Sequence, residues 1–160
     1  HRGTGRDADE NEDRLNPMNK KLKYFVVVLS WLLMWTSATA ETGKEIETES
    51  MRSVISRQLD AFASGDSFTA YAQASPLIQA MFPNHEIFMA MVRNGYGALI
   101  GPTKVDFLGV EETADGPIFG VKVYARDGSL WLAAYQMVRG ESDGWRINGC
   151  RLVRYAGQPI

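Results

Sequence analysis

The sequence has a single cysteine and very little histidine. Cys150 stands alone in a chain of 160 residues, so an internal disulfide is impossible, and we expect a buried free thiol. A reactive or intermolecularly paired thiol is the alternative. A structural zinc site takes four Cys or His ligands, whereas His85 is the only histidine after the first residue. The sequence therefore predicts no metal, and nothing in it indicates a cofactor.

An excess of one charge and the common catalytic motifs are also missing. Between Ser50 and Ile160, 10 acidic residues balance 10 basic ones, so this part carries no electrostatic footprint for nucleic acid or anionic lipid. The sequence contains neither a G-x-S-x-G nucleophile elbow nor a glycine-rich phosphate loop. These absences predict no nucleic-acid partner and exclude the best-known signatures of nucleophilic and phosphate chemistry.

The segment from Met18 to Ala40 has the three parts of an export signal. Basic Asn19–Lys23 is followed by the apolar run Tyr24–Trp35. The small residues Ala38-Thr39-Ala40 then predict cleavage before Glu41. The apolar run would span about 18 Å as a helix, short of the roughly 30 Å of a hydrocarbon core. We therefore predict a periplasmic or extracellular protein with no stable membrane anchor after cleavage.

The remaining chain is expected to form one domain. Residues 1–17 are polar and precede the expected start at Met18, so they are interpreted as a non-native extension or a disordered arm. Residues 41–50 form a charged leader, 51–155 a single domain and 156–160 a tail. A domain of this length can bury a core without disulfides or metal.

Helices are predicted first along this domain, and strands follow. Apolar residues recur at spacings of three and four from Met51 to Phe62, which predicts an amphipathic helix that Gly65 ends. Three short helices are predicted next, at residues 67–74, 76–82 and 85–94. After Pro102 the apolar pattern has a period of two and predicts four strands, at residues 104–111, 118–125, 129–139 and 144–155. Turn residues such as Asp127-Gly128 between the strands make the sheet antiparallel.

The predicted sheet is curved. Gly109, Gly120 and Gly149 fall inside strands, where glycine usually marks a bulge or a bend. The sequence therefore predicts an α+β fold in which N-terminal helices pack on a curved four-stranded antiparallel sheet.

This order of elements resembles the cone-shaped α+β fold of cystatin-like and nuclear transport factor 2-like proteins. That superfamily includes ketosteroid isomerase-like and polyketide cyclase-like proteins. Three segments resemble an exported family catalogued as domain of unknown function 4864, namely Ile55–Phe62 with Gly65-Asp66, Phe88–Arg93 with Gly95-Tyr96, and Trp145–Leu152. The resemblance implies a fold and export, and it brings no activity with it.

A cone fold implies a cavity that opens at one end. Five side chains are candidates for its lining: Tyr71, Met91, Tyr96, Trp131 and Tyr135. Trp131 and Tyr135 are four residues apart on one predicted strand and so share a face, which helix residues must cover. The alternative is that these side chains simply fill the core.

Three polar residues are weaker candidates. Asp60 on the first helix is expected to be solvated. Asp106 alternates with apolar neighbours and is expected to face solvent. Arg151 is predicted to share a strand face with Trp145 and Ile147, from which it could reach a cavity carboxylate; exposure at the strand end is the alternative.

Three functions remain open, in this order of preference. The first is a non-catalytic module that binds a small apolar or amphipathic molecule in the cavity. The second is a homodimeric interaction protein that uses the outer face of the sheet. The third, implied by the resemblance to ketosteroid isomerase-like proteins, is an acid-base isomerase or dehydratase that uses Asp60 or Asp106 with a tyrosine.

Overall fold

The computed structural model describes residues 36–142 and 144–157. Among them, no helix is both long enough and apolar enough to cross a membrane. The apolar run of the predicted export signal lies outside the described residues, so that prediction is not tested here.

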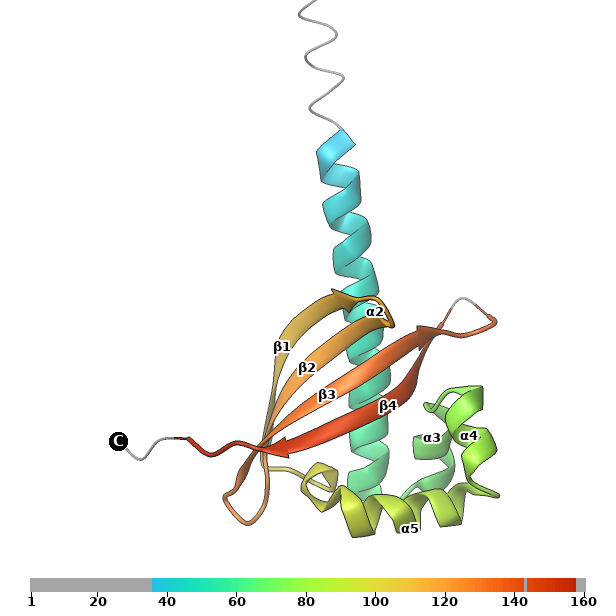
Figure 1. The fold of residues 1–160 in the computed structure, drawn as a ribbon, viewed down its shortest axis with the longest axis vertical. Coiled ribbons are helices and arrows are strands. Elements are labelled where there is room, and N and C mark those ends of the chain that lie inside the picture. The colour runs from blue at the N-terminus through green and yellow to red at the C-terminus, as the bar shows by residue number, and fades with distance from the viewer. Residues whose placement is uncertain (1–35, 143, 158–160) are drawn as a thin grey trace, which may run out of the picture. The chain divides into compact units, whose positions relative to one another are not determined.

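Helices precede strands along the chain, and the predicted α+β class is confirmed (Figure 1). The elements are α2 (Thr36–Ser64), α3 (Ser67–Ala72), α4 (Pro76–Met81), α5 (His85–Gly95), η1 (Gly97–Leu99), β1 (Lys104–Thr113), β2 (Gly116–Tyr124), β3 (Leu130–Arg139) and β4 (Trp145–Arg154). The four strands form one antiparallel sheet in the order β1-β2-β3-β4.

Local sequence explains where the helices begin. Asp66, Ser75 and Asn84 each precede a helix, and each side chain accepts a hydrogen bond from a backbone N–H in the first turn. The first helix differs from its prediction because α2 begins at Thr36 instead of Met51. Residues 41–50, predicted as a charged leader, are helical, as their many glutamates and a lysine allow.

The core lies between α2 and one face of the sheet, called here the inner face. Met51, Ile55, Leu59 and Phe62 on α2 are buried. They belong to the same cluster as the buried inner-face residues Phe119, Val121, Tyr135 and Met137. The spacing of three and four on α2 and the alternation on β2 and β3 thus meet in one core, as the pattern predicts.

Two bulges interrupt the pairing of the strands. On β1 the register shifts between Phe107 and Gly109. On β4 it shifts so that Met137 pairs with Ile147 and Gln136 pairs with Gly149, which leaves Asn148 as the extra residue. Both bulges lie next to a glycine named in the sequence as a bulge signal.

The β4 bulge decides between the two positions predicted for Arg151, a cavity-facing one and an exposed one. Strict alternation from Trp145 and Ile147 would place Arg151 on the inner face. The extra residue reverses the alternation, so that Cys150 pairs with buried Tyr135 while Arg151 pairs with Ala134 and is exposed. Arg151 therefore lies on the outer face.

A short segment between α3 and α4 is tied to the free edge of β4. The backbone N–H of Ser75 donates to the carbonyl of Ile147 at 2.8 Å, and the N–H of Ile147 donates to the carbonyl of Gln73 at 2.9 Å. The Ser75 hydroxyl also donates to Asn148 Oδ1 at 2.7 Å, directly at the bulge. These bonds fix the small helices against the end of the sheet where the cavity described next is found.

Candidate functional site

An apolar cavity of about 260 Å³ lies between the helices and β4. It is called here the apolar cavity, and residues of α2, α4, α5, η1 and β4 contribute to its wall. The lining residues are Gln58, Phe62, Ala74, Ile78, Met81, Phe82, Phe88, Met91, Val92, Tyr96, Leu99, Ile147, Gly149 and Cys150.

An aromatic cluster forms one side of the apolar cavity. The ring of Phe88 is buried, and its centroid lies 5.5 Å from that of Tyr71, 5.6 Å from that of Phe82 and 6.4 Å from that of Phe62. These rings come from α2, α3, the end of α4 and α5, so the cluster joins all four segments.

Gln58 is the polar side chain best placed to orient a ligand. It is 4% exposed and lines the cavity, and its Nε2 donates to the Ala70 carbonyl at 3.1 Å. That bond fixes the amide orientation, since a carbonyl requires a donor. Within the described part of the chain the Gln58 amide oxygen accepts no hydrogen bond, so it is available to accept one from a ligand.

The thiol of Cys150 also lines the cavity, in an unreactive form. Burial raises the pKa of Cys150 to about 12, and a hydrogen-bonding contribution from the Tyr135 hydroxyl opposes that rise. The thiolate is the nucleophilic form of cysteine, so at neutral pH this thiol acts as a small apolar group.

The hydroxyl of Tyr135 lies beside Cys150 in the core. Burial raises the pKa of Tyr135 well above its ordinary value, and the neighbouring Cys150 acts in the same direction. The side chain is 0% exposed, and its hydroxyl completes no hydrogen bond of normal geometry to any described residue.

We therefore expect Tyr135→Phe to stabilise the fold by about 1 kcal/mol, since it removes a buried polar group that lacks a good partner and keeps the ring. Urea unfolding followed by circular dichroism measures the change. Tyr71→Phe is the matched control, because the Tyr71 hydroxyl donates to the carbonyls of Gln79 at 2.8 Å or Phe82 at 3.0 Å. That variant should lose about 1 kcal/mol. A loss of stability in Tyr135→Phe would mean that its hydroxyl has a strong partner.

The structure brings together only part of the predicted pocket. Met91 and Tyr96 line the apolar cavity, and Tyr71 contacts its Phe88 wall. Tyr135 is buried in the core, which was the alternative reading of that residue. Trp131 shares the inner face with Tyr135, as predicted, but it lies near the start of β3 and lines a different groove. Sharing a face therefore did not place both side chains in one pocket.

Neither candidate carboxylate lines the apolar cavity. Asp60 is exposed. Asp106 lies on the outer face of the sheet, where it pairs with Lys122 on β2. Its carboxylate lies 3.0 Å from Lys104 Nζ. The hydrogen bond from Lys104 lowers the pKa of Asp106, and one from the Tyr124 hydroxyl acts in the same direction. The predicted solvent-facing position of Asp106 matches this placement.

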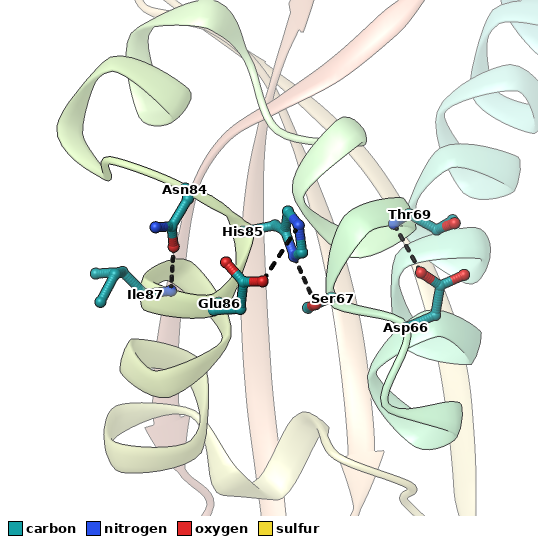
Figure 2. Close-up of polar contacts among 7 residues, drawn as sticks. All are labelled: Asp66, Ser67, Thr69, Asn84, His85, Glu86 and Ile87. Atoms are coloured by element: carbon teal, nitrogen blue, oxygen red, sulfur yellow. Dashed lines mark hydrogen bonds and ion pairs between the residues drawn. The ribbon is translucent and has the colours of Figure 1, made fainter.

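A contact between a serine and a histidine was not predicted from the sequence. Ser67 Oγ lies 2.8 Å from His85 Nδ1, and the other ring nitrogen lies 3.6 Å from Glu86 Oε1; both contacts are drawn as dashed lines in Figure 2. A hydroxyl can donate to Nδ1 or accept from it, so the Ser67–His85 contact can persist whether or not the ring is protonated. These residues do not line the apolar cavity, and their contact joins the start of α3 to the start of α5. No group of three or more His, Cys, Asp or Glu side chains in the described ranges could hold a metal ion.

The comparison with protein families gives one match. A family model described as "Domain of unknown function (DUF4864)" matches residues 44–160. The chain belongs to the DUF4864 family. The matched range contains every residue that lines the apolar cavity, so the cavity is part of the DUF4864 domain. No curated protein and no solved structure matches the chain.

Proposed function

We propose that this DUF4864 domain is a non-catalytic module that binds a small apolar or amphipathic molecule in the apolar cavity. The observation that carries this proposal is a mostly apolar cavity of about 260 Å³ with one buried amide oxygen free to accept a hydrogen bond. Typical ligand pockets begin at about 300 Å³ and combine apolar walls with a few polar groups. The ligand is therefore smaller than a typical drug molecule and offers one hydrogen-bond donor.

Binding is favoured over acid-base catalysis by the chemistry of the wall. Among the described residues, no carboxylate or histidine lines the cavity, and the pKa of its thiol is raised to about 12. The polar groups left there are amide and hydroxyl groups, which can orient a ligand but are poor proton carriers at neutral pH. The enzyme alternative therefore has no observation in its favour.

A homodimer formed through the outer face of the sheet is the second candidate. Leu108 is 60% exposed and packs beside Gly120 on that face, and Val153 is 49% exposed there. Exposed apolar side chains on a sheet face favour association.

We also propose a cone of the nuclear transport factor 2-like type for the fold, and export for the protein. Two bulges that curve the sheet, and helices packed against its inner face, support the cone. The pattern from Met18 to Ala40 supports export, which requires a mature N-terminus at Glu41.

The binding proposal can be tested with indole, which is small and flat and has one N–H donor. Calorimetric titration should detect binding to the wild-type protein. Met91→Trp fills the apolar cavity and should weaken indole binding by about tenfold or more. Ile87→Trp is the matched control, because Ile87 lies on the same helix and is 49% exposed, so indole affinity should not change.

The role of Gln58 is tested by comparing indole with naphthalene, which has no donor. Gln58→Met keeps the side-chain volume and should weaken indole binding by about five- to tenfold while leaving naphthalene binding unchanged. Thermal unfolding confirms that each variant is folded. Equal indole affinity in the wild type and in folded Met91→Trp would contradict the proposed site.

A further inference from the structure

Leu99 of η1 lines the apolar cavity, whereas Gly97 and Ala98 of η1 lie in the wall of a second groove. Its volume is about 470 Å³, and its wall includes Arg93 at the end of α5, Arg126 in the turn between β2 and β3, and Trp131 on β3. We call it the arginine groove. We propose that it binds a small organic anion, in which a carboxylate or phosphate is attached to a flat apolar body.

Arg126 is held in place although it is exposed. Its Nε donates to the Gly101 carbonyl at 2.8 Å. Gly101 has a φ of +59°, and a Cβ at that residue would lie 2.4 Å from Arg126 Nη2. The guanidinium therefore rests on a glycine that leaves room for it. Neither terminal nitrogen of Arg126 donates a hydrogen bond to a described residue, so both are available to an oxyanion.

The charge around the arginine groove is positive. The Arg93 side chain makes no ion pair or hydrogen bond within the described ranges, and Arg154 Cζ lies 6.0 Å from the ring centroid of Trp131. The one acid in the wall, Asp127, already accepts hydrogen bonds from the Ser129 N–H at 2.9 Å and its hydroxyl at 2.5 Å. These bonds lower the pKa of Asp127, and the charge of Arg154 acts in the same direction.

Two basic side chains elsewhere on the domain already have carboxylate partners. Lys104 lies within 3.0 Å of Asp106, and Arg139 pairs with Glu47. In a domain whose total charge is balanced, two arginines without a carboxylate partner in one groove favour an anionic ligand.

Trp131 determines what the rest of the ligand should be. Its indole N–H donates to Ser129 Oγ at 2.8 Å, so its remaining contribution is ring surface. Ile100 and Leu152 add apolar surface beside it. The flat apolar body of the ligand can contact this surface while its carboxylate or phosphate accepts hydrogen bonds from the guanidinium groups of Arg93 and Arg126.

The test uses 2-naphthoate and 2-naphthyl phosphate as probes and 2-naphthamide as the uncharged comparison, in calorimetric titrations of the full chain. We expect at least one anion to bind about tenfold or more tightly than the amide, and binding to weaken when NaCl is raised to about 0.5 M. The stronger of the two anions shows whether carboxylate or phosphate is preferred.

The variants separate this groove from general charge and from the apolar cavity. The double variant Arg93→Gln and Arg126→Gln should weaken anion binding by about tenfold or more. Arg151→Gln removes the same charge from an exposed arginine on the outer face and should leave binding unchanged. Met91→Trp, which fills the other cavity, should also have no effect. Gly101→Ala should act in the same direction as Arg126→Gln, because it displaces the guanidinium.

Four results would overturn the proposal. The first two are equal affinity for the anions and the amide, and unchanged anion binding in the folded double variant. The third is a loss of anion binding in Arg151→Gln as large as that in the double variant. The fourth is the absence of any binding heat with every probe up to about 5 mM. Binding of anionic vesicles but of neither soluble probe would assign the groove to a membrane surface and would also contradict it.

Discussion

Phe88→Ala is expected to lower the free energy of unfolding by about 3–5 kcal/mol. Phe88 is 4% exposed and packs against three other rings, which come from α2, α3 and the end of α4. Its removal leaves a void next to a cavity that already exists, so the neighbouring rings cannot easily fill it. Urea unfolding measures the loss.

Phe68→Ala is the matched control for this prediction. Phe68 is 68% exposed and contacts the His85 ring edge-on at 5.7 Å. The same substitution at that position should change stability by only about 0.5 kcal/mol. A loss of less than about 1 kcal/mol in Phe88→Ala would show that the aromatic cluster does not hold the small helices to α2.

Cys150 is expected to react with iodoacetamide about a thousandfold more slowly in the native protein than in urea at pH 8. Its pKa of about 12, against an ordinary value of 9.0, reduces the thiolate fraction by about that factor, and burial slows the reagent further. Mass spectrometry over time measures the rate. The control moves the thiol to an exposed helix position, as Ala63→Cys in a Cys150→Ser background, and should react at the rate of the unfolded chain.

The same shift predicts how stability depends on alkaline pH. The unfolded chain loses the thiol proton near pH 9, whereas the folded chain keeps it until about pH 12. The stabilising effect of the protonated thiol is therefore complete below about pH 9 and is lost as the pH rises toward 12, by about 4 kcal/mol at most. The wild type should lose more stability over this range than Cys150→Ser, which cannot ionise. Cys150 is half-buried, and identical pH profiles or fast alkylation of the native protein would contradict the raised pKa of its thiol.

Short-range patterns in the sequence were enough to predict most of the fold. The strand pair joined by Asp127-Gly128 is confirmed, with Gly128 at a φ of +82° and Ala125 bonded to Ser129 across the turn. The caps at Ser75 and Asn84 also lie where the sequence places helix starts. In each of these cases the residues that decide the structure are neighbours in the chain.

Contacts between residues that are distant in sequence, in the candidate site and elsewhere, were harder to predict. Ser67 and His85 are 18 residues apart, and no spacing rule brings them together. Nothing in the sequence of α2 distinguishes Gln58 from an exposed polar residue. Its amide is buried because α3 packs against it and the Ala70 carbonyl accepts its hydrogen bond. At Asn148 a single extra residue reverses the faces of all later positions in β4, which the period of two cannot reveal.

The segment from Gln73 to Ser75 has a consequence for the solubility of the protein. β4 is an edge strand, and an edge strand with free N–H and C=O groups can recruit another chain and start aggregation. The backbone groups of Ile147 on that edge are already occupied by Gln73 and Ser75. The first part of β4 is thereby closed to a further strand, and the same contacts that fix the helices also protect this part of the edge from pairing with another chain.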